Sequence, residues 1–381
     1  MGKHPRQGSD GKNSSKHSFF INCIMSQHPK KQFLLPVIML LYVTVFSGCD
    51  IQKKYSSEIF KSLTVPEEGG IKFTQLTKTE DIVKGPATKI VKQTVKQGNI
   101  IKQIDVLRWS TATFLSISPD GKMFTFLGNN NNSDNLFVRS TSGGAGSTQR
   151  TFRNNVYDFC YSPDGKTLAF SEFVGTGTGG NYNIYSINVN RGNAVRQIAS
   201  TAADEFNSVF TDDSKTIFYS NGNSGNYNIW SLDLNTGLRT QYSDGFNPCI
   251  MPNTNSKELF ICRNAKNSVR SEIWKLNIEN GSETQYIADP NRSFSSPKVS
   301  PDGKYILVTA STPKSTVRPQ NLDLYLFNID GTGETQLTFH PGLDASAIWS
   351  PSGKEIYFIS SRGFVSGDYN VWRMNIENII K

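Results

Sequence analysis

Histidine is scarce in this sequence, with four in 381 residues, and His4, His17 and His28 all precede Cys49. Only His340 follows that cysteine, so a metal site built on several imidazoles is excluded for the rest of the chain. A Ser-His-Asp hydrolase would have to use His340, yet the sequence has no Gly-x-Ser-x-Gly motif to present a serine. His340 precedes Pro341-Gly342 and is expected in a loop. We therefore expect no catalytic residue, no metal and no cofactor.

An excess of charge is also missing from most of the chain. The formal net charge is +8, but the excess is concentrated in residues 1–48, where six basic residues face the single acid Asp10. Beyond residue 48 the basic and acidic residues nearly balance. A nearly neutral domain lacks the basic surface that nucleic acids require, so we expect no nucleic-acid partner.

No apolar run is long enough for a permanent membrane-spanning helix. The longest, Phe33–Phe46, follows Lys30 and Lys31 and ends in Ser47-Gly48-Cys49, as in a secretory signal peptide. Small residues directly before a cysteine resemble the bacterial lipobox. The resemblance implies that Cys49 receives diacylglycerol, although Phe46 departs from the aliphatic residue usual there. An ordinary signal peptide followed by a chance cysteine is the alternative.

These features predict an order of segments along the chain. Met25 stands where such a signal would begin, so residues 1–24 are interpreted as an upstream extension and 25–48 as the signal peptide. Residues 49–98 mix polar residues with Pro and Gly and are expected to be a tether, followed by a folded domain over 99–381. The mature protein is expected in the cell envelope, bound through Cys49 to a bacterial membrane on its periplasmic or outer-membrane face.

One short motif recurs through the folded domain. Ser-Pro-Asp-Gly-Lys occurs at 118–122, 162–166 and 300–304, with degenerate copies at 211–215 and 350–354 and a stretched copy at 251–257. Pro fixes φ and Gly accepts φ > 0, as a hairpin turn requires. Successive copies are 42–50 residues apart, which is the length of one four-stranded propeller blade. The spacing predicts an all-β fold, a propeller of six blades.

Each turn is flanked by strand-like patterns. A first strand is expected to end at an apolar residue before each turn, and these ends are Ile117, Tyr161, Phe210, Ile250, Val299 and Trp349. A second apolar strand, an alternating third and a short polar fourth follow. The last blade ends after its third strand, so the ring needs a strand from the amino-terminal side. Ile101–Ile104 is predicted to be this closing strand. Gln103 precedes the turn lysine Lys122 by 19 residues, and in other blades the fourth-strand glutamine precedes the next turn lysine by 18 or 19 residues. The similar stretch Thr74–Thr77 lies too close to Gln103 along the sequence for a seventh blade to fit between them.

The repeats Ser-Pro-Asp-Gly-Lys, Asn-Ile-Tyr/Trp and Gln-Leu-Thr resemble those of the TolB-like propeller family, over roughly residues 99–381, and most closely at 323–338. The resemblance implies a monomeric binding protein whose partner is an envelope protein, such as a peptidoglycan-associated lipoprotein. TolB itself has an α/β domain before its propeller and is not lipidated. Residues 49–98 are too few for that domain, so the resemblance covers the propeller alone.

A recurrent tyrosine motif is the candidate binding site. Gly-Asn/Asp-Tyr-Asn precedes three third strands and places Tyr182, Tyr227 and Tyr369 near the loops that join fourth to first strands. Arg292 and His340 lie in those loops. Tyr and Arg are common anchors of protein interfaces, which predicts a partner-binding patch around the channel mouth. The alternative is structural, with the tyrosines packed between blades.

Two other functions stay open. A carbohydrate-active or peptidase-like propeller could work with carboxylates alone, and Asp158, Asp204, Glu205 and Asp344 lie near the starts of first strands. A purely structural spacer would bind no partner. Gly175–Gly180 is not interpreted as a nucleotide site, because a strand and not a helix follows it. Gly165-Lys166-Thr167 resembles the end of a P-loop, but Cys160 stands where the first glycine is required.

Two smaller expectations concern lysines and cysteines. Thr88 to Val95 could pair with Ile100 to Leu107 and extend the last blade, with its lysines guarding the edge or meeting anionic lipid. Cys249 and Cys262 lie on neighbouring strands, either opposed or two residues apart. Free buried thiols are favoured over a disulfide, because cross-strand geometry often does not suit one.

Overall fold

The computed structural model describes residues 67–380, except for 79–80, 98–99, 131–132, 145, 154, 177–178, 191–193, 253–254, 256, 313–319 and 363–367. The predicted extension, signal peptide and Cys49 lie outside the described residues. Residues 57–381 form one compact unit, which contains every strand described below. Within the described part of the chain, no helix has the length and apolar character needed to cross a membrane.

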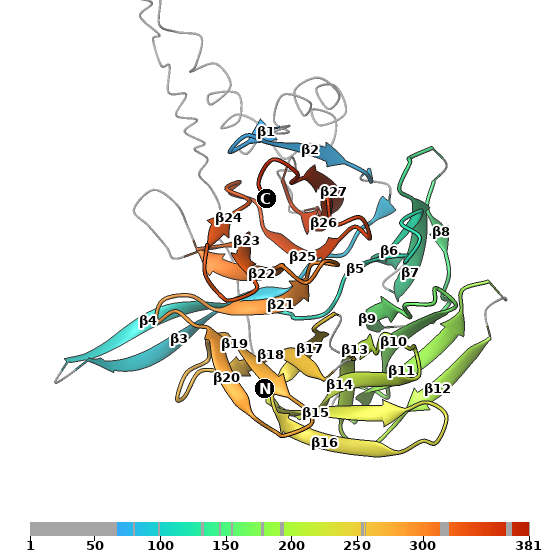
Figure 1. Ribbon diagram of the computed structural model, residues 1–381, viewed down its shortest axis with the longest axis horizontal. Coiled ribbons are helices and arrows are strands. Elements are labelled where there is room, and N and C mark those ends of the chain that lie inside the picture. Colours follow the sequence, from blue (N-terminus) through green and yellow to red (C-terminus); the bar gives the residue numbers. More distant parts are fainter. Residues whose placement is uncertain are drawn as a thin grey trace, which may run out of the picture. The chain divides into compact units, whose positions relative to one another are not determined.

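Six antiparallel sheets are arranged in a ring, and each runs from a first, inner strand to a fourth, outer one (Figure 1). Blade 1 comprises β5 (Leu115–Ile117), β6 (Met123–Asn130), β7 (Ser133–Ser140) and β8 (Thr148–Gln149); blade 2, β9 (Val156–Tyr161), β10 (Thr167–Val174), β11 (Asn181–Asn188) and β12 (Val195–Ala199); blade 3, β13 (Asp204–Phe210), β14 (Thr216–Asn223), β15 (Asn226–Asp233) and β16 (Arg239–Asp244); blade 4, β17 (Phe246–Ile250), β18 (Glu258–Asn264), β19 (Ser271–Asn277) and β20 (Glu283–Ile287); blade 5, β21 (Phe294–Val299), β22 (Tyr305–Thr312), β23 (Asn321–Asn328) and β24 (Thr335–Gln336); and blade 6, β25 (Asp344–Trp349), β26 (Glu355–Ser360) and β27 (Asn370–Asn375).

The ring is closed. First strands of successive blades contact one another, and β25 of blade 6 also contacts β5 of blade 1. All six predicted first-strand ends coincide with the ends of β5, β9, β13, β17, β21 and β25. The predicted six-bladed propeller of four-stranded blades is therefore confirmed.

The recurrent turn is held by its own side chains. In blade 1, the Ser118 hydroxyl donates to the Asp120 carboxylate (2.6 Å) and accepts the Met123 N–H (3.0 Å), while Asp120 accepts the Lys122 N–H (3.1 Å). These bonds lower the pKa of Asp120, with the Ser118 hydroxyl as the largest cause. Gly121 takes φ +70°, which a residue with a side chain rarely adopts. The Ser-Pro-Asp-Gly-Lys motif therefore contains the side chains that stabilise its own turn.

The closing strand is not the predicted one. Strand β2 (Ile71–Gln75) is the fourth strand of blade 6 and pairs with β27, with β1 (Glu67–Glu68) outside it. The Gln75 side chain donates to the Thr77 carbonyl (2.8 Å), and the Thr77 hydroxyl accepts the Val371 N–H (2.8 Å). Gln149 with Thr151, and Gln336 with Thr338, make the same bonds in blades 1 and 5. Gln103 lies on a strand that pairs elsewhere (Ile100–Trp109 with Thr88–Gln97) and has Asp105, not threonine, two residues later.

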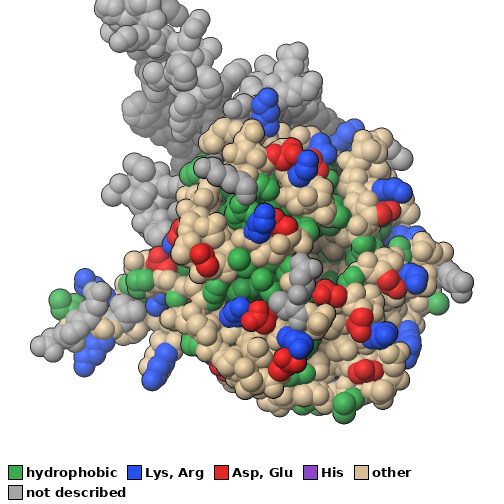
Figure 2. All heavy atoms as spheres, in the orientation of Figure 1, with side chains coloured by type: hydrophobic (Ala, Val, Ile, Leu, Met, Phe, Trp, Pro, Cys, Tyr) green, Lys and Arg blue, Asp and Glu red, His purple; other side chains and the backbone are tan. Residues whose placement is uncertain are grey.

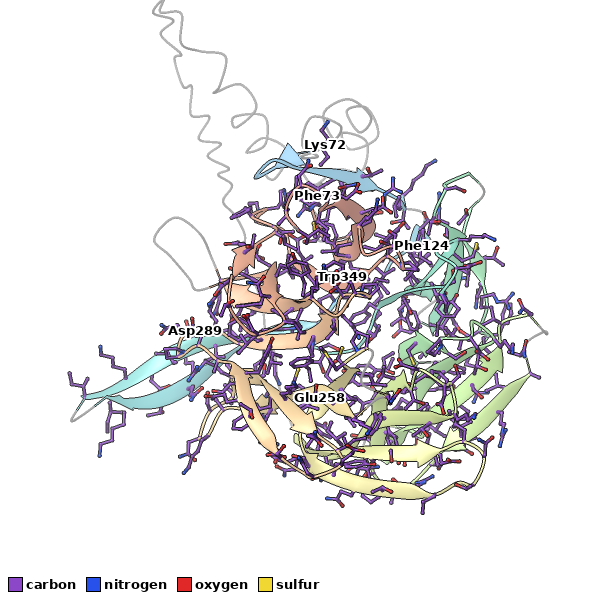
Figure 3. All side chains as sticks on the ribbon, viewed as in Figure 1. Lys72, Phe73, Phe124, Glu258, Asp289 and Trp349 are labelled. Atoms are coloured by element: carbon purple, nitrogen blue, oxygen red, sulfur yellow. The ribbon has the colours of Figure 1, made fainter. Side chains whose placement is uncertain are left out.

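Phe73 anchors the closing strand. Figure 3 shows Phe73 pointing from β2 into blade 6, while the neighbouring Lys72 points outward. The Phe73 ring meets Phe358 edge-on at 5.9 Å and lies 4.2 Å from the Arg362 guanidinium. Arg362 is completely buried and pairs with Asp344 at 2.8 Å. Part of the segment expected to be a tether thus completes the propeller.

The predicted pairing of Thr88–Val95 with Ile100–Leu107 is confirmed, but its place is different. Strands β3 (Thr88–Gln97) and β4 (Ile100–Trp109) form a separate two-stranded sheet and do not extend blade 6. The hairpin projects from the ring (Figure 1). At the base of the hairpin, Leu107 is buried against Leu322 and Ala345. Halfway along it, the Gln93 side chain accepts hydrogen bonds from the 268–269 loop of blade 4.

The cysteines of the described part of the chain are free thiols, as favoured. Cys249 lies opposite Phe260 and Cys262 lies opposite Phe246, so the two are not cross-strand partners. Burial raises the pKa of the Cys262 thiol to about 12, which keeps it protonated. These two thiols belong to the hydrophobic cluster between blades 4 and 5.

Candidate binding site at the channel mouth

The connection from β4 to β5 crosses one mouth of the central channel. The Trp109 indole N–H donates to the Ser295 hydroxyl of blade 5 (2.8 Å), and the Ser110 hydroxyl bonds the Tyr157 hydroxyl of blade 2 (2.9 Å). The amides of Asn207 (blade 3) and Asn247 (blade 4) both donate to the Thr111 carbonyl, at 3.2 and 2.8 Å. The crossing segment, residues 109–112, is thus bonded to four other blades by these contacts alone.

A repeated backbone irregularity supplies the two asparagines. The first strands of blades 3 to 6 each carry a bulge where they pair with their second strands. Asn207, Asn247, Ser296 and Ser346 take φ values of +51° to +54° at these bulges. Asparagine tolerates this region better than most residues with a side chain. A bulge redirects a side chain locally, and here the Asn207 and Asn247 amides reach the crossing segment.

A small aromatic cleft lies beside this segment. Its volume is about 180 Å³, and its walls include Tyr157, Phe206, Tyr227 and Phe246 from blades 2 to 4 together with residues 107–111. The ring of Phe206 meets that of Tyr227 edge-on at 4.9 Å. Arg108, which is exposed, also lines the cleft. The cleft therefore offers rigid aromatic walls with one cation at the rim.

Two of the five predicted partner-binding residues share this site. Tyr227 lines the cleft, and Tyr182 lies directly behind it, with its ring 4.7 Å from that of Tyr157. Burial raises the pKa of Tyr182 to about 12, so its hydroxyl stays neutral. The repeated tyrosine motif thus contributes to the site through blades 2 and 3.

The other three predicted residues lie elsewhere. Tyr369 packs on Gly85, where an added Cβ would be 2.4 Å from the ring, and its hydroxyl donates to the Pro86 carbonyl. Arg292 pairs with Asp289 and, through two bonds of 2.5 and 3.0 Å, with Glu334. His340 accepts the Gly342 N–H on Nδ1 at 2.8 Å. These contacts give all three a structural role in their loops.

The cleft residues that the sequence did not reveal are Tyr157, Phe206 and Phe246. Each lies in a first strand, but they share no repeated motif. Their approximate alignment with the start of each first strand is the only signal, and it is too weak to separate a channel residue from an ordinary core residue.

The acidic residues of the enzyme alternative are held in structural contacts. Asp158 accepts the Asn207 N–H at 2.8 Å, and burial raises its pKa to about 6. Asp204 accepts the Tyr182 N–H, Glu205 lies 3.7 Å from Arg239, and Asp344 pairs with Arg362. Among the described residues, no group of three or more His, Cys, Asp or Glu side chains could hold a metal ion.

Comparison with known proteins identifies the family. The profile of the TolB beta propeller domain matches residues 105–317, more than half of the chain. The chain belongs to this family.

Solved structures agree with the TolB-like fold. A protein from Agrobacterium tumefaciens described as a TolB superposes with a TM-score of 0.51 at 18% identity, covering 71% of this chain and 93% of that one. TolB from Acinetobacter baumannii gives 0.53 at 17%, covering 68% and 64%. An oligogalacturonate lyase from Vibrio parahaemolyticus gives 0.53 at 12%, covering 83% and 97%. At these identities the likeness shows the fold alone.

A shorter match links the TolB-like propeller to a curated sequence. An uncharacterized protein of Agrobacterium fabrum is 37% identical over 78 residues, which is 20% of this chain and 24% of that protein. The chain thus spans about a quarter of that relative's length, and the match indicates no activity.

Proposed function

We propose that this protein is a non-catalytic, lipid-anchored component of the bacterial cell envelope whose propeller binds a protein partner at the aromatic cleft. The observation that carries the proposal is the cleft itself, where Tyr157, Phe206, Tyr227 and Phe246 meet beside exposed Arg108. Aromatic and arginine side chains provide most of the binding energy in many protein interfaces. Its volume of about 180 Å³ is below the roughly 300–1,000 Å³ of small-molecule pockets. Such a cleft suits one anchoring side chain of a larger partner.

The crossing segment favours binding over catalysis. It occupies the mouth of the channel that an enzyme of this fold could use to enclose a substrate, and Asn207 and Asn247 hold it there. The likeness to an oligogalacturonate lyase is a likeness of fold, and fold does not imply activity. A carbohydrate-active or peptidase-like enzyme remains the alternative. Turnover on a panel of glycans and peptides that disappears in Asp158→Asn or Asp204→Asn would support the enzyme instead.

The family relationship suggests the class of partner. Membership of the TolB-like propellers supports an envelope protein, and a peptidoglycan-associated lipoprotein is the first candidate. The propeller is expected to act as a monomer, without nucleic acid or cofactor.

The partner site is tested by recovery of envelope proteins on the tagged chain. Tyr227→Ala with Phe246→Ala removes two cleft walls and should reduce recovery at least about tenfold, since truncating an interface anchor typically costs 2 kcal/mol or more. Phe152→Ala is the matched control, because Phe152 is an exposed aromatic residue that does not line the cleft. Equal recovery by both variants, with unchanged melting temperatures, would contradict the site. The absence of any saturable partner for the wild-type chain would favour a structural spacer.

The lipid anchor is tested separately. Cells fed a palmitate analogue should label the wild-type chain and leave Cys49→Ala unlabelled, and fractionation should then find the variant released from the membrane. Label retained by Cys49→Ala would contradict lipidation at that residue and leave the partner site unaffected.

A further inference from the structure

The projecting hairpin is strongly basic. Its strands β3 and β4 carry five cationic residues (Lys89, Lys92, Lys96, Lys102 and Arg108) and one acidic residue, Asp105. All of these side chains are exposed. Lys92 lies 3.5 Å from Asp105, so one positive charge has a counterion nearby. Figure 2 shows the Lys and Arg side chains gathered on this projection, at the left of the view. Such a concentration of exposed positive charge is suited to an anionic partner.

Near its outer end the same hairpin exposes one isoleucine on each face. Ile100 and Ile101 are 57% and 70% exposed. Because successive residues of a strand point to opposite faces, their side chains lie on opposite sides of the hairpin. A protein that docks on a sheet meets one apolar face. An end that exposes an apolar side chain on each side is suited to insertion into a medium that surrounds it.

The lysines lie at the depth that such insertion requires. Lys96 is paired with Ile101 across the hairpin. Lys102 is the next residue after Ile101 toward the base of the hairpin, a step of about 3.3 Å along the strand. Interfacial segments bury their apolar residues about 5–10 Å into the headgroup region. Long lysine side chains can then extend to the phosphate layer while their stems stay among apolar groups.

We propose that the β3–β4 hairpin binds an anionic lipid bilayer directly, with Ile100 and Ile101 inserted and Lys96 and Lys102 on the lipid phosphates. This contact is independent of the lipid on Cys49 and of the aromatic cleft, so it does not rest on the proposed partner. An anchored chain would then be held at two points, and the propeller would have a fixed orientation to the membrane.

The test uses the segment 57–381, which forms its own compact unit and contains the strand that closes the ring. It lacks Cys49 and the apolar leader, so vesicle binding reports the propeller and hairpin alone. We expect co-sedimentation with vesicles of mixed phosphatidylcholine and phosphatidylglycerol, little with pure phosphatidylcholine, and release as salt is raised to about 0.5 M.

Two variants separate the contributions. Lys96→Glu with Lys102→Glu should weaken partition at least about 30-fold, because each lysine near an anionic surface contributes about fivefold. Ile100→Ser with Ile101→Ser should weaken it about tenfold through lost apolar insertion. Lys122→Glu with Lys166→Glu is the matched control, since it makes the same charge change on two exposed turns of the propeller.

Three results would overturn the proposal. They are equal binding to neutral and anionic vesicles, wild-type binding by both hairpin variants, or equal losses in the turn control. A hairpin variant that keeps vesicle binding but no longer recovers an envelope protein would identify the hairpin as a protein-docking element instead. Far-ultraviolet circular dichroism of each variant ensures that folding is not the cause.

Discussion

Two buried carboxylates, Asp344 and Asp158, differ in whether a positive charge neutralises them. Arg362 and Asp344 are both completely buried and pair with each other, while Phe73, Phe358 and Trp372 surround the guanidinium. Asp158 is different, because its hydrogen bonds from neutral groups do not offset the cost of burying a carboxylate, and its pKa is raised to about 6. The charged form of Asp158 is therefore a source of instability at neutral pH.

This residue predicts a pH dependence of stability. Below about pH 4, Asp158 is protonated in both the folded and the unfolded chain. Between about pH 4 and 6 the unfolded chain loses this proton while the folded chain keeps it, so the folded state is destabilised as pH rises through this window. The penalty reaches about 2–3 kcal/mol above pH 6, at 1.36 kcal/mol per pKa unit.

Asp158→Asn should remove this penalty, because the asparagine carbonyl can still accept the Asn207 N–H. Urea unfolding at pH 4.5 and pH 7 measures the effect. The variant should be about 2–3 kcal/mol more stable than the wild type at pH 7 and only about 1 kcal/mol more stable at pH 4.5, where the wild type carries part of the penalty. An unchanged difference between the two pH values in the variant would assign the pH dependence to other groups.

At the scale of elements, blade 6 combines a strand that precedes the other blades in the sequence with the last three strands of the propeller. Strand β2 lies between β27 and β1, and it brings Phe73 onto Phe358 and Arg362. Without β2, β27 would present an unpaired edge, and the apolar surface around Trp372 would lose its cover. The closing strand therefore stabilises the whole ring and not only its own sheet.

Neighbouring residues of β2 give a matched pair of variants. Phe73→Ala should lower the free energy of unfolding by about 3–5 kcal/mol, the usual cost of truncating a buried phenylalanine. Lys72→Ala changes the next residue, which is exposed on the opposite face, and should change stability by less than about 0.5 kcal/mol. Urea denaturation of both variants checks this, and similar values for the two would show that β2 does not close the ring.

The elements differ in how far the sequence reveals them. The first-strand ends, such as Tyr161 and Phe210, are predictable because a local turn motif follows each of them. The closing strand is not found by spacing, because an inserted hairpin separates it from blade 1 and removes the fixed distance that applies within blades. Thr77, two residues after Gln75, is the local signal that distinguishes it from Gln103.

The candidate site is only partly predictable for a related reason. Tyr182 and Tyr227 come from a repeated motif, so they can be recognised as a set. The crossing segment at Thr111 has no repeat and no turn signature. Its position depends on contacts with blades far away in the sequence, and such contacts leave no local pattern.

At the scale of the whole molecule, the crossing segment connects the blades through the channel as well as around the ring. Thr111 accepts hydrogen bonds from blades 3 and 4, Trp109 donates to blade 5, and Ser110 bonds blade 2. The same segment continues from the base of the hairpin and forms a wall of the aromatic cleft. The hairpin is therefore connected to the cleft through residues 107–112 and through the bonds of Gln93 to the 268–269 loop, where Val269 lines the cleft.

Replacing Asn207 and Asn247 by glycine can remove their hydrogen bonds to the Thr111 carbonyl without straining the backbone. Asn207 and Asn247 both have φ near +54°, a value that glycine adopts freely, whereas alanine would add strain. Asn207→Gly with Asn247→Gly should therefore report the loss of the two amide bonds to Thr111. Asn255→Gly, at φ +52° in an exposed turn of blade 4, controls for the added backbone freedom.

The expected result is local. Amide hydrogen exchange over residues 109–114 should become at least about tenfold faster in the double variant, because each buried hydrogen bond contributes about 1 kcal/mol and both bonds hold the same carbonyl. Exchange in the outer strands should stay as in the wild type, and Asn255→Gly should leave the crossing segment protected. If protection of residues 109–114 is unchanged in the double variant, the remaining contacts, including those of Trp109, Ser110 and Ser346, are sufficient to hold the segment. The position of the cleft wall would then not depend on the asparagines.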